Sequence, residues 1–475
     1  MKKMLFMRTI AIMFLALFLA GCNTDTLPND QNNTDNNTTN VVEHNGPIHA
    51  ADFSVTLDVN ETTLRANWSE KASAVSEDNG SIVATVKTQG RYGLFALDGD
   101  AIVYVRQTEG NASDSGVLKL EEGNSTVEVT VTVTVLYWKQ LAAGYYYTMG
   151  IKNDGTLWGW GANNYGQLGD GTTVDRTAPV QIGSDTHWQK VYTKFNHTLA
   201  IKTDGTLWGW GYNRFGQLGN GTTVDQHIPT QEPTKATNWS DVATGYYHTI
   251  AVKSDGTLWA SGRNNFGQLG DNTAVDKHIF VPISAAVTDW SQVAAGYYHS
   301  VALRADGTLW AWGHNNYGQL GDGTVTDRPV PTREALADTD WARIATGYNH
   351  TLAIKTDGTL FAWGYNNYAE MGDGTRGSKS TPTQEASMAS DWTEVDGGSY
   401  HSVGIKSDGT LWSWGYNNYG QLGSTASINV FRYAPELVDG ESGYLYVHAG
   451  QLHTVALKSN GALRYWGMVA GSSHP

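Results

Sequence analysis

The sequence predicts an all-β protein whose larger part is a ring of repeated four-stranded units. Seven tight-turn dipeptides lie 50 to 52 residues apart: Asp154-Gly155, Asp204-Gly205, Asp255-Gly256, Asp306-Gly307, Asp357-Gly358, Asp408-Gly409 and Asn460-Gly461. The stretches around them carry strand and turn signals but no helical periodicity, and all but one of the 18 tryptophans fall among them. A fixed period of this length is typical of a radial β-repeat, so the copies predict a seven-bladed β-propeller. A small β-sandwich-like domain is expected before it.

The first 22 residues have the order of a signal peptide. Lys2, Lys3 and Arg8 precede an apolar run over residues 9–20, which is too short for a comfortable membrane-spanning helix. The run is followed by Gly and Cys22, and the ending LAGC resembles the lipobox of bacterial lipoproteins. The resemblance implies cleavage before Cys22 and acylation of that residue, which would give a stable membrane anchor. An ordinary secretory signal with an incidental cysteine, or an uncleaved anchor, is the alternative.

Cys22 is also the only cysteine of the 475 residues. This single cysteine occupies the position that a lipobox requires. Because the chain has no second cysteine to pair with it, an intramolecular disulfide is excluded. We expect an exported, lipid-anchored protein at a bacterial cell membrane or outer membrane. Residues 23–50 are rich in Asn, Thr and Asp and poor in apolar residues. Such a composition predicts a disordered tether between the anchor and the first folded domain.

Residues 51–135 are expected to form the β-sandwich domain, with antiparallel sheets in a loosely immunoglobulin-like arrangement. Apolar and polar residues alternate over residues 53–59 and 81–86, and residues 101–105 are a further strand candidate. The clearest period-two run of the chain is VEVTVTVTV at residues 127–135. We expect this domain to serve as a spacer or as an accessory binding module.

Residues 136–475 hold the repeats, and the third copy shows their four strands. Candidate strands cover residues 239–243, 248–253 and 257–261, and a weaker one lies around residues 279–281. The second and third strands are joined by a two-residue Asp-Gly loop, which favours the positive φ angles of a type I′ hairpin. Four antiparallel strands in each of seven copies would build the blades of the propeller.

The repeat follows the pattern W-x-x-V-x-x-G-x-x-H-T-x-A-x-K-x-D-G-T-L-W-x-W-G-x-N-x-x-G-Q-L-G-D-G-T. This pattern resembles the repeat of the regulator of chromosome condensation family, and the resemblance implies a seven-bladed propeller. Two departures matter. Lys194 occupies a position that is Gly in the other six copies, and the last copy has Arg464 in place of Trp and stops before its outer strand. We expect that last blade to be three-stranded or to be completed by the segment just before Trp138.

Strand parity predicts where a ligand would bind. If the strands of a blade run from A to D, the A–B and C–D loops emerge on one face and the B–C hairpins on the other. The A–B loops carry a ring of tyrosines and asparagines, and Tyr offers rigid contact area with a polar tip. The binding candidates in these loops are Tyr146, Asn196, Tyr247, Tyr298, Asn349 and Tyr400.

Other recurrent polar residues are expected to be structural. Repeated acids such as Asp170 and Asp175 lack the ligand count of a recognised calcium loop, so no metal and no cofactor is expected. One histidine follows the A–B loop in most copies, and we expect each to hydrogen-bond within its own blade. These histidines are His197, His248, His299, His350, His401 and His453.

The composition and the missing motifs argue against several classes of function. The formal charge of −15 and the lack of a basic stripe argue against a nucleic-acid partner. No Gly-x-Ser-x-Gly elbow or phosphate-binding glycine loop is present. We expect a membrane-anchored binding or scaffold protein whose propeller face recognises a protein or a cell-envelope glycan. The alternative is an extracytoplasmic enzyme acting on a glycan or another substrate at the propeller centre. Guanine-nucleotide exchange, which the family resemblance also suggests, fits an exported protein poorly.

Overall fold

The computed structural model describes residues 125–284, 286–423 and 430–468, together with the strands that lie between residues 48 and 122. The signal segment with Cys22, and nearly all of the 23–50 linker, lie outside the described residues. The described part is made of strands and turns, and it contains no helix long and apolar enough to cross a bilayer. The predicted all-β class is confirmed.

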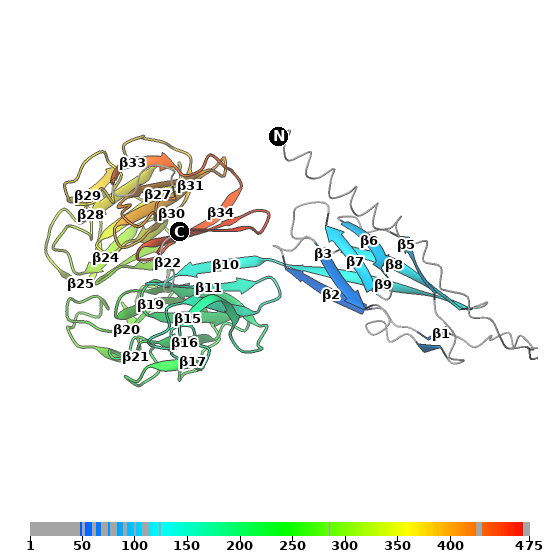
Figure 1. Ribbon diagram of the computed structural model, residues 1–475. Helices are drawn as coiled ribbons and strands as arrows, with labels where there is room; N and C mark the ends of the chain where they lie inside the picture. Colours follow the sequence, from blue (N-terminus) through cyan, green and yellow to red (C-terminus); the bar gives the residue numbers. More distant parts are fainter. Residues whose placement is uncertain are drawn as a thin grey trace, which may run out of the picture.

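The small N-terminal domain has two main sheets, which Figure 1 shows beside the propeller. Their strand orders are β2-β9-β8-β5 and β3-β7-β6, and β1 pairs with β4. The strands are β1 (Ile48–His49), β2 (Phe53–Asp58), β3 (Thr63–Asn67), β4 (Val75–Ser76), β5 (Val83–Thr88), β6 (Gly93–Asp98), β7 (Ala101–Arg106), β8 (Asp114–Glu122) and β9 (Ser125–Leu136). On β9, Val129, Val131 and Val133 are buried, as the period-two pattern predicts.

One pairing in this domain differs from the expected antiparallel arrangement. The first long strand, β2, runs parallel to the last, β9, with Phe53 opposite Val131 and Asp58 opposite Leu136. Parallel neighbours need a long crossover connection, and here the six strands between them provide it. The expectation of purely antiparallel sheets was therefore wrong for this edge.

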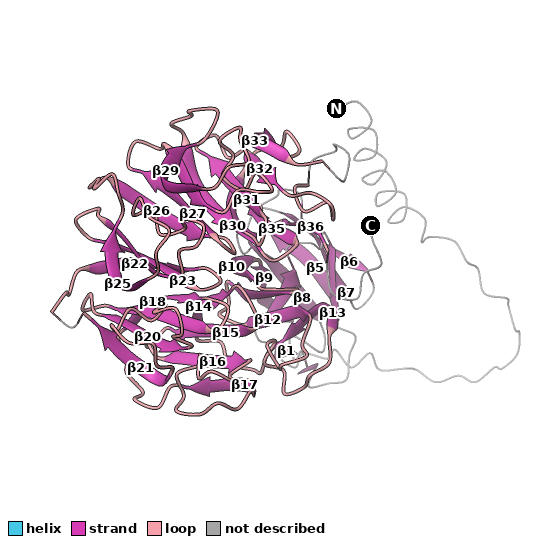
Figure 2. Cartoon of the chain, turned by 90° about the vertical axis from the view of Figure 1, so that its left-hand side faces the viewer, coloured by secondary structure: helices cyan, strands magenta, loops and turns pink. Residues whose placement is uncertain are grey.

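The rest of the chain forms seven blades around one axis, confirming the predicted propeller (Figure 2). We number the blades 1 to 7 in chain order. The innermost strands are β10 (Trp138–Ala143), β14 (Trp188–Thr193), β18 (Trp239–Thr244), β22 (Trp290–Ala295), β26 (Trp341–Thr346), β30 (Trp392–Gly397) and β34 (Tyr444–Ala449). The second strands are β11 (Tyr147–Lys152), β15 (His197–Lys202), β19 (His248–Lys253), β23 (His299–Arg304), β27 (His350–Lys355), β31 (His401–Lys406) and β35 (His453–Lys458).

The outer strands follow in the same order in every blade. The third strands are β12 (Leu157–Gly161), β16 (Leu207–Gly211), β20 (Leu258–Gly262), β24 (Leu309–Gly313), β28 (Leu360–Gly364), β32 (Leu411–Gly415) and β36 (Leu463–Gly467). The outermost strands are β13 (Arg176–Gln181), β17 (Gln226–Gln231), β21 (Lys277–Ile283), β25 (Arg328–Arg333), β29 (Lys379–Gln384) and β33 (Arg432–Leu437). All pairings within the blades are antiparallel, so strand parity assigns the loops to faces as expected.

The Asp-Gly turn explains why its sequence phrase recurs. Gly155 has a φ of 79°, a conformation that glycine adopts without strain, whereas Asp154 is not among the residues with positive φ. The expected type I′ turn was therefore wrong, because that turn needs positive φ at both residues. The Asp154 carboxylate accepts hydrogen bonds from the backbone N–H of Thr156 at 3.0 Å and from its hydroxyl at 2.7 Å. The same hydroxyl accepts a bond from the Trp158 indole at 2.8 Å. The D-G-T-L-W phrase therefore builds one complete hairpin.

The hydrophobic core lies between neighbouring blades. Between blades 1 and 2, Met149 and Ile151 pack with Trp188 and Trp210, and all four side chains are buried. Equivalent clusters fill the other blade interfaces. The ring is closed in the same way, because Trp138 and Leu141 of blade 1 pack against Val455 and Leu457 of blade 7. Closure of this kind leaves no long sheet edge for aggregation.

The recurrent histidines link neighbouring blades, so the expectation that each would bond within its own blade was wrong. His350 Nε2 lies 3.0 Å from the Ser402 hydroxyl of the next blade. That hydroxyl donates its proton to the carbonyl of Glu370, at 2.8 Å, so the imidazole must be the donor. Burial lowers the pKa of His350 to about 3, which keeps the ring neutral. Five of the histidines bridge in this way: His197, His248, His299, His350 and His401.

The last blade has three strands in the part of the chain that the structure describes. Of the two expected arrangements, this is the three-stranded one, because β10 pairs with β11 of its own blade and no described segment before Trp138 joins β36. In blade 1, Tyr147 replaces the histidine, and its hydroxyl bonds to Thr193 and, at 2.9 Å, to Thr198 of blade 2. The inter-blade bridge is therefore kept there with a different side chain.

Candidate functional site: an aromatic face around the propeller axis

The A–B loops bring aromatic side chains from distant parts of the sequence to one end of the propeller axis. At the centre, Tyr297 stacks on Tyr348 with ring centroids 3.8 Å apart, and it contacts Tyr246 with tilted rings whose centroids are 4.1 Å apart. Phe195 closes the group, 5.0 Å from Tyr246, and is only 3% exposed. We call Phe195, Tyr246, Tyr297 and Tyr348 the axial cluster. It covers this end of the central channel with rings from four consecutive blades.

A second tier of rings lies outside the axial cluster on blades 2 to 4. Tyr247 lies 4.6 Å from Phe215, and Tyr298 lies 5.0 Å from Phe266. The guanidinium of Arg263 stands over this group, 4.8 Å from the Phe215 ring and within 6 Å of both tyrosine rings. Both tyrosines are half-buried. A cation over aromatic rings fixes their orientation and adds polarity to the surface.

A similar tier continues on blades 5 and 6. Tyr400 lies 5.1 Å from Tyr368 and 6.1 Å from Tyr416, and Tyr416 stacks on Phe431 at 5.9 Å. Tyr400 also lies 5.8 Å from Tyr348 of the axial cluster. The rings therefore form one connected surface from blade 2 to blade 6. We call this surface, with Tyr146 on blade 1, the aromatic face.

The sequence-predicted candidates all lie in the loops of this face. Tyr146, Tyr247, Tyr298 and Tyr400 are half-buried and contact other rings, with Tyr146 lying 4.8 Å from Tyr145. The two asparagine candidates are also half-buried. Their backbone carbonyls are used by the loops themselves: Asn196 accepts from Tyr212 N at 3.0 Å, and Asn349 accepts from Tyr365 N at 2.8 Å.

Sequence reasoning missed part of this surface. It did not select the axial cluster, nor Phe215 and Phe266, which come from the C–D loops. A signal was present, because an aromatic residue recurs just before the Gly in loops such as 163–166 and 213–216. The first Asn of these loops has a different use. Asn163 is fully buried, and its side chain bonds to Asp170 at 3.0 Å and accepts from Leu168 N at 2.9 Å.

The chemistry of the face is that of recognition. Burial raises the pKa of Tyr145, Tyr146 and Tyr400 above the usual range, so their hydroxyls stay protonated near neutral pH. Within the described residues, no group of three or more His, Cys, Asp or Glu side chains is placed to hold a metal ion. Asp170, for example, is occupied by Asn163, by Thr172 and by an ion pair with Arg176.

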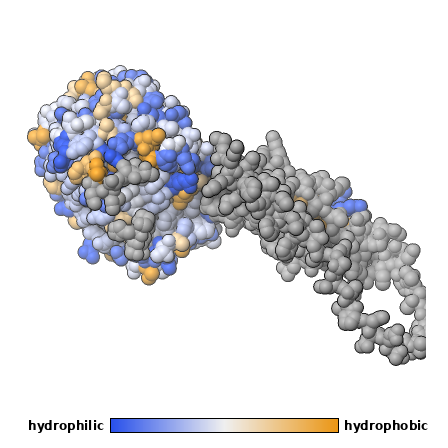
Figure 3. All heavy atoms as spheres, turned by 45° about the horizontal axis from the view of Figure 1, so that its top comes forward, coloured by the Kyte–Doolittle hydropathy of each residue, from blue (hydrophilic) through white to orange (hydrophobic). Residues whose placement is uncertain are grey.

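The side of the propeller seen in Figure 3 is largely hydrophilic, and its hydrophobic residues form small separate patches. The aromatic face differs from that side in being built of clustered aromatic rings. An all-β ring of seven four- and three-stranded blades with an aromatic face at one end of its axis defines a seven-bladed β-propeller.

The chain belongs to the regulator of chromosome condensation (RCC1) family. The family model of the RCC1-like domain matches residues 106–389, and models of the RCC1 repeat match residues 408–457 and 392–421. The ultraviolet-B receptor UVR8 of Arabidopsis thaliana is 30% identical over 334 residues, which cover 69% of this chain and 76% of that protein.

Other proteins resemble part of this chain in sequence or resemble the propeller in fold. The probable E3 ubiquitin-protein ligase HERC4 of Homo sapiens is 33% identical over 204 residues, covering 42% of this chain but 19% of its own length. The structure of yeast RCC1 (Prp20) bound to Kap60 is 22% identical with a TM-score of 0.60, covering 71% of this chain and 81% of that one. Human WBSCR16 gives the same TM-score at 23% identity, covering 68% and 87%. These two structures show the likeness of fold.

Proposed function

We propose that this protein is a lipid-anchored, extracytoplasmic binding protein that docks a partner protein on its aromatic face and performs no catalysis there. The observation that carries the proposal is the connected aromatic surface from blade 2 to blade 6. Half-buried tyrosines such as Tyr247 and Tyr298 lose little side-chain freedom on binding, because neighbouring rings already hold them. Aromatic residues and arginine are also the side chains most often dominant in protein interfaces.

The relatives support a protein partner in general terms. The structure of yeast RCC1 (Prp20) has been determined in complex with Kap60. The crystal structure of Prp20p from Saccharomyces cerevisiae has been described together with its binding properties to Gsp1p and histones. Those partners belong to those proteins. What comes to this chain is the use of an RCC1-type propeller as a docking surface.

The path of the chain suits an anchored receptor. Strand β9 leads through Tyr137 into the start of β10, so the chain enters the propeller at the face opposite the A–B loops. In Figure 2 the strands of the N-terminal domain lie behind the propeller. A membrane anchor upstream of that domain would attach the protein on the side opposite the aromatic face, so the anchor itself would not cover that face.

The test is affinity capture of envelope proteins by the full-length chain and by a Tyr247→Ala/Tyr298→Ala variant. We expect the variant to lose most of the captured partner while keeping its melting temperature within a few degrees. Tyr433→Ala is the matched control, because this tyrosine is 42% exposed on the outer strand β33, away from the face. Capture that is unchanged in the double variant would contradict the proposal. If a glycan is captured in place of a protein, the aromatic face would be a glycan-binding surface, since stacked tyrosines also suit sugar rings.

A further inference from the structure

The central channel of the propeller is lined by alternate residues of the seven innermost strands. The axial cluster closes it at the A–B end, together with closely packed glycines of the blades other than blade 2. The channel holds a cavity of about 250 Å³. The third residues of the innermost strands surround its other end, where the side chain of Arg343 is 49% exposed and Tyr446 is 46% exposed. The cavity therefore opens on the face from which the chain enters the propeller.

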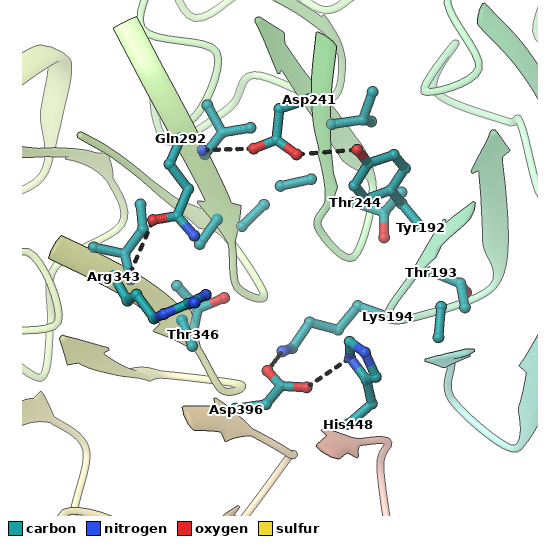
Figure 4. A pocket seen from close by; sticks show the side chains of 18 of the residues that line it. Tyr192, Thr193, Lys194, Asp241, Thr244, Gln292, Arg343, Thr346, Asp396 and His448 are labelled. Carbon is teal, nitrogen blue, oxygen red and sulfur yellow. Dashed lines mark hydrogen bonds and ion pairs between the residues drawn. The ribbon is translucent and has the colours of Figure 1, made fainter. Parts of the chain in front are cut away.

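The middle of the cavity is asymmetric, although the ring is built from repeats. At the fifth position of the innermost strand, four blades carry alanine: Ala142, Ala243, Ala294 and Ala345. The other three blades carry Tyr192, Asp396 and His448. Lys194, two positions after Tyr192, replaces the glycine of the other blades. Blades 3 to 5 thus carry small apolar residues at the fifth position, where blades 2, 6 and 7 carry polar ones. Other residues of blades 3 to 5 that line the cavity, such as Asp241, Gln292 and Arg343, are polar (Figure 4).

An ion pair crosses the axis on the polar wall. Lys194 Nζ of blade 2 donates to Asp396 Oδ1 of blade 6 at 2.9 Å, although the two residues are 202 positions apart. The other carboxylate oxygen accepts from Ala449 N at 2.9 Å and lies 3.7 Å from His448 Nδ1. Asp396 Oδ1 also accepts from Gly397 N at 2.8 Å. The side chains of Lys194 and Asp396 keep 15% and 17% exposure, and both residues line the cavity.

The charges around the cavity limit what it would hold. Three acidic side chains line it, those of Asp241, Glu394 and Asp396, together with two basic side chains, those of Lys194 and Arg343. Glu394 pairs with Arg343 at 2.9 Å, and Asp241 accepts from the Tyr192 hydroxyl at 3.0 Å. An anion such as phosphate would add to the excess of carboxylates, which costs free energy in a confined site. A ligand that carries one positive and one negative group adds no net charge.

We propose that the central cavity binds a zwitterionic α-amino acid with an apolar side chain. Its carboxylate would pair with Lys194 and His448, and its ammonium group with Asp396. The two charges of an α-amino acid are about as far apart as those of the Lys194–Asp396 pair. A ligand can therefore lie alongside the pair in the opposite direction, with its carboxylate next to Lys194 and its ammonium group next to Asp396, so that each charge neighbours only opposite charges. The side chain would lie against Ala243, Ala294 and Ala345. This inference is independent of the partner on the aromatic face.

The test uses L-leucine as the probe, titrated calorimetrically into the full-length chain at millimolar concentration. The key variant is Lys194→Gly/Asp396→Ala, which introduces the glycine that the other six blades carry at the first position and the alanine that four of them carry at the second. We expect it to fold and to bind leucine at least about ten-fold more weakly. N-acetyl-leucine lacks the ammonium group and leucine amide lacks the carboxylate, so each should lose a similar factor. Glycine lacks the apolar side chain and should also bind more weakly.

Tyr247→Ala is the control, since it alters the aromatic face but not the cavity, and it should leave leucine affinity unchanged. Absence of leucine binding to the original chain would overturn the inference and leave the ion pair as a brace across the ring. Equal binding of leucine and N-acetyl-leucine, or undiminished binding by the double variant, would also overturn it. Preferential binding of leucyl-leucine, whose charges lie much farther apart, would contradict the proposed pairing with Lys194 and Asp396.

Discussion

Glu370 should make the stability of the propeller depend on pH. It stands where the other complete blades carry glutamine: Gln167, Gln217, Gln268, Gln319 and Gln421. Its side chain is fully buried, Oε2 accepts from Tyr368 N at 2.9 Å, and Oε1 has no partner among the described residues. Burial raises the pKa of this carboxyl from 4.5 to about 8. The folded state therefore holds it protonated at neutral pH.

The sign and size of the effect follow from linkage between folding and protonation. Because the folded pKa is raised, the stability due to this group is complete below pH 4.5 and is lost as pH rises to about 8. The unfolded chain releases the proton over this range, whereas the folded chain keeps it. At ~1.4 kcal/mol per pKa unit, the loss reaches roughly 5 kcal/mol at high pH. For a propeller of this size, that corresponds to a melting temperature lower by about 7 °C.

The assay is differential scanning calorimetry of the original chain and of Glu370→Gln between pH 5 and pH 9. We expect similar melting temperatures at pH 5 and a growing advantage for Glu370→Gln above it. Gln217→Glu is the converse control, because Gln217 is also fully buried, accepts from Phe215 N at 3.1 Å and leaves Nε2 without a partner in the described structure. It should acquire the same pH dependence. Parallel curves for the original chain and Glu370→Gln would refute the reasoning.

Three further predictions concern the ring and its anchor. Lys194→Gly alone should lower the free energy of unfolding, measured by urea denaturation, by roughly 2 kcal/mol, because the Asp396 carboxylate then loses its cation while staying hydrogen-bonded and partly hydrated. Adding Asp396→Ala should recover most of the lost stability. If the double variant recovers none of it, this account is contradicted. His350→Ala should cost about 3 kcal/mol in the same measurement, through a cavity and a broken bridge to Ser402, whereas the exposed His278→Ala should change stability by less than about 0.5 kcal/mol. Cys22→Ser should abolish incorporation of labelled palmitate in cells, and label retained by that variant would exclude the lipobox interpretation.

The repeat made most of the fold predictable. The Asp154-Gly155 turn and its six counterparts set the number of blades, and the alternating valines of β9 set a strand with one buried side. These are local patterns, because turn geometry and the two-residue period act between neighbours in sequence. The parallel pairing of β2 with β9 was not predictable in this way, since it joins the two ends of a domain.

The candidate site was predictable by its loops but not by its contacts. Strand parity placed Tyr247 and Tyr298 on one face, and both lie there. It could not show that Phe215 and Phe266 pack beside them, because these rings come from C–D loops of the preceding blades. Parity also gave no sign that His350 would reach Ser402 of the next blade, 52 residues on.

What the sequence by itself determined is the architecture: seven similar units, their hairpins, the faces of their loops, and the positions at which a copy departs from the others. What only the tertiary structure decided is what those departures do together. Lys194 and Asp396 are isolated exceptions in separate repeats, and they meet because closing a seven-bladed ring brings the innermost strands of blades 2 and 6 across a common axis. The period specifies each unit, but contacts across the axis depend on the closure of the ring.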